Sequence, residues 1–196
     1  KAVWERLDRL DKFALQHGLF YNEKEKMSHI PFLNMITVAA NRGNYQRAGS
    51  LMADYMAEIE EGMRYEVTIL ADAIVLFGQK RYAEVLQQLK KFDDHRFREP
   101  NFAIRFRLLK LISMYESGLD TDGLWNDAVS FEAFLRRSES PWKNAAKASL
   151  AFVRFYKQLI LRRPKTKELK AYMNTAKPLF FGAWLLEKFV DYRPVK

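Results

Sequence analysis

The amino-acid sequence predicts an all-α protein, built as a solenoid of antiparallel helix pairs. Leucine and alanine together number 43, against 22 for valine, isoleucine and threonine, and this balance favours helices over strands. A short phrase also occurs twice between apolar helical stretches, as NRGNYQRA at 41–48 and as GQKRYAEV at 78–85. Its tyrosines, Tyr45 and Tyr82, are 37 residues apart. A turn that recurs at such a period is typical of stacked helix pairs.

Apolar spacing and capping residues place about ten helices along the chain. Gly18 ends the first helix, Pro31 suits the first turn of the second, and Asn44 caps the third. Further on, Pro100 opens a longer helix that Gly118 ends. The helices are expected near residues 4–16, 28–39, 44–59, 69–77, 82–89, 100–117, 122–137, 141–162, from 166 onward, and 178–190.

The chain has no Gly/Ser-rich or Pro-rich linker, so we expect a single helical-repeat domain over 1–196. The repeats are clearest at 30–92, and longer, divergent helix pairs follow at 100–190. The last helix, 179–190, is apolar nearly all round, which is typical of a buried helix. We expect it to cover the open end of the stack. The alternative is an interface for a second copy or for a missing part of the same chain.

The repeated phrase resembles the turn of a tetratricopeptide repeat, a family of helix pairs of about 34 residues. In that family the turn carries a small residue, an aromatic residue two positions on, and an alanine three positions later. Gly43, Tyr45 and Ala48 match this pattern, and the resemblance covers about a third of the chain. It implies stacked helix pairs that act as a non-catalytic scaffold for protein–protein interaction. The second copy keeps the spacing with two replacements, as Lys80, Tyr82 and Val85.

The peptide clamp known in that family does not carry over to this chain. The clamp holds a terminal carboxylate with Lys, Asn and Arg on the first helix of each pair. The corresponding positions here include Leu33, Thr37, Leu70 and Ile74, and only Asn41 is similar. We therefore expect any groove in this region to be apolar or filled by neighbouring helices.

The net charge of +9 is concentrated in the second half of the chain, because residues 1–98 carry +1 and residues 99–196 carry +8. The densest segment is 136–170, where basic residues recur at helical intervals among the aromatic residues Trp142, Phe152, Phe155 and Tyr156. The candidate partner-binding residues are Arg136, Arg137, Lys143, Lys147, Arg154, Lys157, Arg162 and Arg163.

Three interpretations of this basic segment stay open. It docks an acidic protein surface or anionic lipid, or it binds nucleic acid through phosphates with the aromatic residues beside them. The third interpretation is a solvated helix face whose aromatic residues point into the core. We expect a protein partner, and a partner with an acidic surface would match the charge of this segment. Nucleic-acid binding is the alternative.

No residue pattern typical of catalysis, metal binding or a cofactor is present. The chain has no cysteine, and His17, His29 and His95 are far apart without other ligands at metal spacing. No phosphate-binding glycine loop or hydrolase motif occurs. We expect no enzyme, and an enzyme with an unrecognised site is the second alternative.

The sequence also bears on the location of the protein. No apolar run reaches the roughly 18 residues that span a bilayer. The absence of cysteine fits a reducing compartment, so we expect a cytoplasmic protein. The chain begins at Lys1 rather than Met, and we expect it to be a processed or shortened form. Loss of an upstream targeting segment is the alternative that leaves the compartment open.

Overall fold

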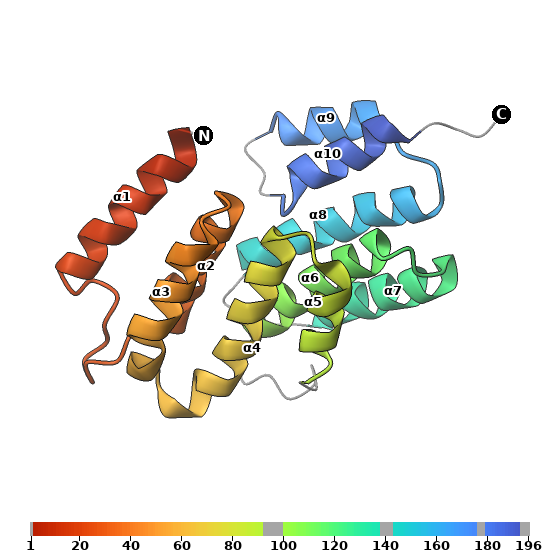
Figure 1. Ribbon diagram of the computed structural model, residues 1–196. Helices are drawn as coiled ribbons and strands as arrows, with labels where there is room; N and C mark the ends of the chain where they lie inside the picture. The colour runs from red at the N-terminus through yellow and green to blue at the C-terminus, as the bar shows by residue number, and fades with distance from the viewer. Residues whose placement is uncertain (1, 92–99, 138–142, 176–178, 193–196) are drawn as a thin grey trace. The chain divides into compact units, whose positions relative to one another are not determined.

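The computed structural model describes residues 2–91, 100–137, 143–175 and 179–192 (Figure 1). Within these ranges ten α-helices and one short 3-10 helix make up the regular structure, and no strand occurs. Two isolated β-bridges, Tyr21 with Met27 and Met27 with Ile59, are the extended pairings that these ranges contain. The prediction of an all-α fold with about ten helices is confirmed.

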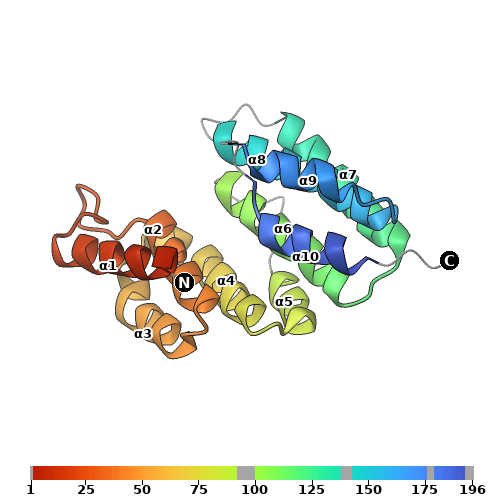
Figure 2. The ribbon, with the colours of Figure 1, turned by 90° about the horizontal axis from the view of Figure 1, so that it is seen from above.

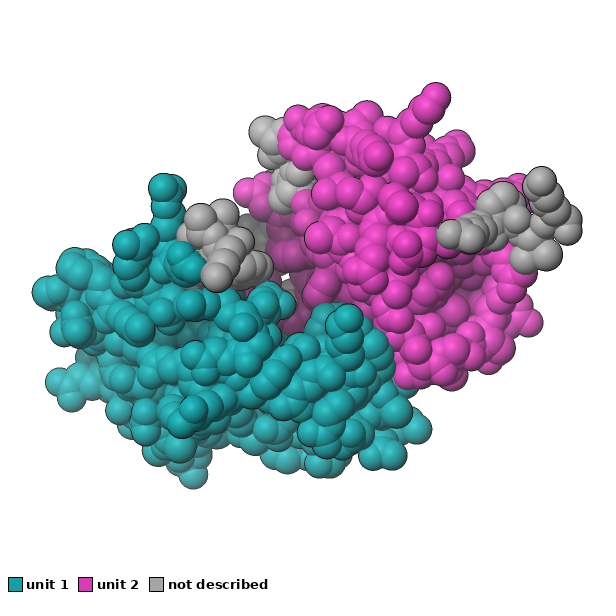
Figure 3. Space-filling view, turned by 45° about the horizontal axis from the view of Figure 1, so that its top comes forward, with its two compact units in different colours: residues 1–97 teal, residues 98–196 magenta. Residues whose placement is uncertain are grey.

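The chain forms two compact units, residues 1–97 and residues 98–196 (Figure 3). We call them unit 1 and unit 2. The expectation of one continuous repeat domain over 1–196 stays a prediction.

Unit 1 contains two helix pairs preceded by one helix. The second helix, α2, packs against its partner α3 and against α4 of the next pair, and α4 packs against α5. Phe32, Ile36, Leu51 and Leu70 are fully buried between these helices. The elements are α1 (Ala2–Gln16), α2 (His29–Asn41), α3 (Tyr45–Tyr55), η1 (Met56–Glu58), α4 (Glu61–Gly78) and α5 (Tyr82–Leu89).

Both copies of the repeated phrase form the turn between the two helices of a pair. Gly43 and Lys80, which occupy the same place in the two copies, both adopt a left-handed backbone, with φ of 70° and 59°. Ala48 and Val85, which also correspond, are fully buried where the paired helices meet. Asn44 caps α3 as expected, because its side chain accepts a 3.0 Å hydrogen bond from the Arg47 backbone N–H.

Most of the positions that correspond to the peptide clamp are packed inside unit 1, and Asn41 is exposed. Leu33, Leu70 and Ile74 are buried, and the Thr37 hydroxyl donates a 2.7 Å hydrogen bond to the Leu33 carbonyl of its own helix. Neighbouring helices therefore fill this region, which is one of the two outcomes that the sequence predicts.

Unit 2 is built around α6, which is buried on nearly every side and packs against α7 and α8. Figures 1 and 2 show α8 beside α7, while α10 packs against both α8 and α9. Phe102, Phe131, Phe152 and Phe155 are fully buried in this unit. The elements are α6 (Pro100–Glu116), α7 (Thr121–Arg137), α8 (Lys143–Ile160), α9 (Thr166–Met173) and α10 (Gly182–Asp191).

The last helix differs from the expectation of a helix buried all round. It begins at Gly182, after Phe181 in a left-handed conformation with φ of 50°, so residues 179–181 are not helical. Leu185 and Phe189 are buried, whereas Val190 is 60% exposed. Only one side of α10 thus packs against α8 and α9, and an interface through 179–190 with a second copy or a missing segment stays a prediction.

Candidate functional site

The basic residues of α8 and the aromatic residues among them lie on opposite sides of the helix. Lys147 and Arg154 are seven residues apart and exposed, and this spacing places them on one face. Phe152, Phe155 and Tyr156 are fully buried. The aromatic rings that alternate with basic residues in the sequence therefore belong to the core of unit 2. Two residues of the predicted set, Trp142 and the side chain of Lys143, lie outside what the structure describes.

Tyr156 shows how firmly these rings are held in the core. Its hydroxyl donates a 2.7 Å hydrogen bond to the Leu111 carbonyl of α6. Burial raises the pKa of this hydroxyl far above its ordinary value, so it stays a neutral donor. Phe152 stacks on the Tyr156 ring with 5.5 Å between centroids. The fold thus assigns these aromatic side chains to packing.

A carboxylate on α7, Glu132, joins two of the predicted basic residues. Its side chain accepts hydrogen bonds from Lys157 of α8 and from the Arg136 guanidinium, whose Nη2 lies 2.6 Å from Glu132 Oε1. The bond from Lys157, followed by that from Arg136, holds the pKa of Glu132 below its ordinary value of 4.5. The Lys157 ammonium also lies 5.1 Å from the centre of the Trp125 ring. These contacts connect α7 and α8 through charge.

A second carboxylate, Glu168 of α9, likewise pairs with a cation of α8. Arg154 Nη2 lies 3.4 Å from Glu168 Oε1, and Lys165 Nζ lies 4.0 Å from Glu168 Oε2. The Arg154 guanidinium also lies over the rings of Phe155 and Tyr172, at 4.5 and 5.3 Å from their centres. Arg154 thus makes one ion pair and two ring contacts while it remains exposed.

These contacts define a basic surface that spans α7, α8 and α9. Around each carboxylate the cations outnumber the anions two to one, because Glu132 faces Arg136 and Lys157 while Glu168 faces Arg154 and Lys165. Lys147 adds an exposed charge that has no ion pair within the described residues. We call this set the basic surface; its members are Glu132, Arg136, Lys147, Arg154, Lys157, Lys165 and Glu168.

The remaining predicted residues lie elsewhere on unit 2. Arg137 is exposed, and its Nε donates a 3.2 Å hydrogen bond to the Ala133 carbonyl of its own helix. Arg163 is exposed just beyond the end of α8. Arg162, its neighbour, lines a cavity at that end of the helix.

Sequence analysis missed the two carboxylates that organise the basic surface. Glu132 precedes Arg136 by four residues, a spacing that predicts a pair on one helix face. Its bond to Lys157 and the pair between Glu168 and Arg154 join different helices, so no local spacing indicates them.

Other kinds of site receive no support from the part of the chain that the structure describes. It contains no group of three or more His, Asp or Glu side chains that could hold a metal ion. None of its helices combines the length and the apolar character needed to cross a membrane. His95 and the Asp93-Asp94 pair lie outside the described residues.

Comparison with known proteins finds no matching family model, no matching curated protein and no matching solved structure. The functional argument therefore depends on the residues of this chain.

Proposed function

We propose that the chain is a non-catalytic helical scaffold that binds an acidic surface of another protein through the basic surface of unit 2. The observation that carries this proposal is the division of α8, whose cations Lys147 and Arg154 face solvent while its aromatic residues are buried. The resemblance of the repeated turn to tetratricopeptide repeats supports the scaffold part of the proposal. The chain has no cysteine, and we place the scaffold in the cytoplasm.

The composition of the basic surface favours a protein over a nucleic acid. Single-stranded nucleic acids bind through both phosphate contacts and the stacking of bases on aromatic rings. Phe152, Phe155 and Tyr156 are unavailable for stacking because they are buried. Glu132 and Glu168 would also repel a continuous row of phosphates, whereas a protein surface can place its carboxylates between them.

Exposed charges of this kind act mainly on the specificity and rate of association. Complementary potentials steer an encounter and reject partners of the wrong sign. The ion pairs around Glu132 and Glu168 limit the freedom of Arg136, Arg154 and Lys157, so less side-chain entropy is lost when a partner binds.

The test compares two variants with the same net charge. Lys147→Glu with Arg154→Glu reverses two charges on the basic surface. Arg9→Glu with Lys90→Glu reverses two exposed charges in unit 1 and serves as the control. Each immobilised protein is incubated with a nuclease-treated lysate, and the bound proteins are identified by mass spectrometry. Circular dichroism checks that both variants stay helical.

We expect the wild-type chain and the unit 1 control to retain the same acidic proteins, and the basic-surface variant to lose them. The nucleic-acid alternative is measured separately with a labelled oligouridylate at rising salt concentration. Tight binding that weakens steeply with salt and depends on Lys147 and Arg154 would favour nucleic acid instead. Equal capture by all three proteins would contradict the proposal.

A further inference from the structure

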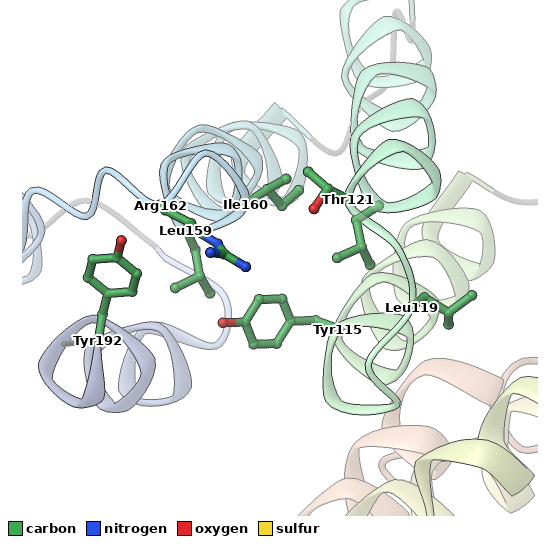
Figure 4. A pocket seen from close by; sticks show the side chains of 8 residues that line it. Tyr115, Leu119, Thr121, Leu159, Ile160, Arg162 and Tyr192 are labelled. Atoms are coloured by element: carbon green, nitrogen blue, oxygen red, sulfur yellow. The ribbon is translucent and has the colours of Figure 1, made fainter. Parts of the chain in front are cut away.

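A cavity of about 380 Å³ lies at one end of unit 2, where the C-terminal ends of α6, α8 and α10 and the start of α7 come together (Figure 4). Leu124 and Leu159 supply apolar walls. Tyr115, Thr121 and Tyr192 bring three hydroxyl groups to the lining, from α6, α7 and the residue after α10. Its volume falls at the small end of the range for ligand sites, which begins near 300 Å³.

Among the described residues that line this cavity, Arg162, which is exposed, supplies the only formal charge. Figure 4 shows its side chain extending into the space beside Tyr115, with Thr121 and Tyr192 on opposite sides. In the part of the chain that the structure describes, the Arg162 guanidinium makes no ion pair and no side-chain hydrogen bond. Its five N–H donors therefore remain available to an anion.

The tyrosine beside Arg162 is kept as a neutral hydroxyl. Burial is the main reason that the pKa of Tyr115 is raised, and the charges of Lys188 and Arg162 oppose the shift only in part. Lys188 is itself paired with Glu116 at 2.8 Å, and Glu116 also accepts a 2.6 Å hydrogen bond from the Trp184 indole. Lys188 and Glu116 thus pair with each other, whereas Arg162 has no ion pair among the described residues.

The backbone at Arg162 adopts a left-handed conformation at the end of α8. The Arg162 N–H bonds to the Leu159 carbonyl at 3.0 Å and the Arg163 N–H bonds to the Gln158 carbonyl at 2.9 Å, which ends α8 in a Schellman turn. This turn requires a left-handed residue, and Arg162 has φ of 53°. Glycine takes this conformation without strain. The same turn after α1, α2 and α6 does use glycine, at Gly18, Gly43 and Gly118.

Arg162 thus occupies a place where glycine would be less strained, and its side chain enters the cavity. Strained backbone often occurs where a side chain has a function. Lys80 is the other cation in such a turn, after α4; it is exposed like Arg162, but it does not line this cavity. Lys80 therefore serves as a control that has the same left-handed conformation but does not line the cavity.

We propose that this cavity binds a small monocarboxylate with an apolar body. The planar guanidinium of Arg162 fits the two oxygens of a carboxylate. Hydroxyls of Tyr115, Thr121 and Tyr192 complete its hydrogen bonding, and the leucine walls hold the apolar part. One cation balances one negative charge, which disfavours a doubly charged phosphate. This site is independent of the basic surface and of the partner proposed for it.

The test uses pairs of probes that differ only in charge. Octanoate is compared with 1-octanol, and 3-phenylpropionate with 3-phenylpropanol, by isothermal titration calorimetry on the full chain. Backbone amide shifts measured by NMR locate the binding. We expect at least one carboxylate to bind about tenfold more tightly than its alcohol, because hydrogen bonds to a charged group are the stronger ones. The shifts should centre on Leu119, Thr121 and Arg162.

Three variants connect this binding to Arg162. Arg162→Gly should abolish the preference for the carboxylate while leaving the melting temperature equal or higher, because glycine relieves the left-handed strain. Arg162→Gln should also abolish the preference and keeps most of the side-chain volume, so it remains informative if the glycine variant unfolds. Lys80→Gly should raise the melting temperature in the same way and bind like the wild type.

Three results would overturn the inference. The first is the absence of saturable binding by both carboxylates at millimolar concentration. The second is equal affinity for each carboxylate and its alcohol. The third is an unchanged preference for the carboxylate in Arg162→Gly and Arg162→Gln.

Discussion

The Tyr45 hydroxyl donates a 2.7 Å hydrogen bond to the carbonyl oxygen of Gly78, and this bond joins the two copies of the repeated phrase. Tyr45 is the first residue of α3, and Gly78 is the last residue of α4. The aromatic residue of one turn thus holds the end of a helix in the next pair. The repeated phrase therefore joins neighbouring helix pairs as well as forming the turn within each pair.

Removing that hydroxyl should weaken the stacking of the pairs. Tyr45→Phe keeps the ring but leaves the Gly78 carbonyl without this donor. We expect a loss of about 1 kcal/mol in the free energy of unfolding, as for a typical partly buried hydrogen bond. Urea unfolding measures the loss. Tyr65→Phe is the control, because that tyrosine is 59% exposed and a smaller change is expected. Equal effects of the two substitutions would contradict this role of Tyr45.

Gly78 should tolerate no larger residue, because α4 lies close to α2 at this point. A Cβ atom there would lie 3.1 Å from both the Cβ and the carbonyl oxygen of Ala40. Gly78→Ala should therefore lower the free energy of unfolding by about 1–3 kcal/mol, although alanine is the better helix former. Gly49→Ala in α3 is the control, because nothing lies within 4 Å of its added Cβ. It should stabilise the protein by about 0.5–1 kcal/mol, and opposite signs in thermal unfolding are the result that supports this contact.

Ala48 marks the close approach of the paired helices α2 and α3. It is fully buried, so Ala48→Glu places a charge where no water reaches it. We expect a loss of about 3 kcal/mol or more, which circular dichroism would detect as a lower melting temperature. Ala53→Glu changes an exposed alanine of the same helix and should have little effect. An unchanged melting temperature for Ala48→Glu would show that this helix contact is misplaced.

Glu132 should make the stability of unit 2 depend on pH. Its pKa is lowered in the folded state by Lys157 and Arg136, so its contribution is present above its ordinary value of 4.5 and is lost as the pH falls through the lowered value. Glu132→Gln should cost up to about 1 kcal/mol at pH 7, as exposed ion pairs do. The difference from the wild type should shrink between pH 5 and pH 3. Urea unfolding across this range measures it, with the exposed Glu23→Gln as a control. A difference that grows at low pH would refute the assigned direction.

Several features of the fold are predictable because they depend on residues near one another in the chain. Asn44 caps α3, and Gly43 adopts the left-handed conformation, as the sequence indicates. The spacing shared by the two phrases also holds in the structure, where Lys80 takes the conformation of Gly43. By contrast, the sequence predicts a start of α10 near residue 178, whereas the helix begins at Gly182, after the left-handed Phe181, whose ring contacts Phe152.

Only part of the arrangement of the basic segment can be predicted from the sequence. Its spacing placed Lys147 and Arg154 on one face of a helix, and this is what the structure has. The same spacing places Phe152, Phe155 and Tyr156 away from these two cations, but spacing alone does not say which face packs against other helices. The packing of α8 against α6 and α10 put Phe152, Phe155 and Tyr156 inside.

The sequence by itself determined the helices, their turns and the excess of positive charge in the second half of the chain, because capping, periodicity and composition act locally. The tertiary structure decided which residues meet across helices: Tyr45 with Gly78, Glu132 with Lys157, and Arg162 with the cavity beside Tyr115. These encounters join segments far apart in the chain, and only the packing of whole helix faces brings such segments together.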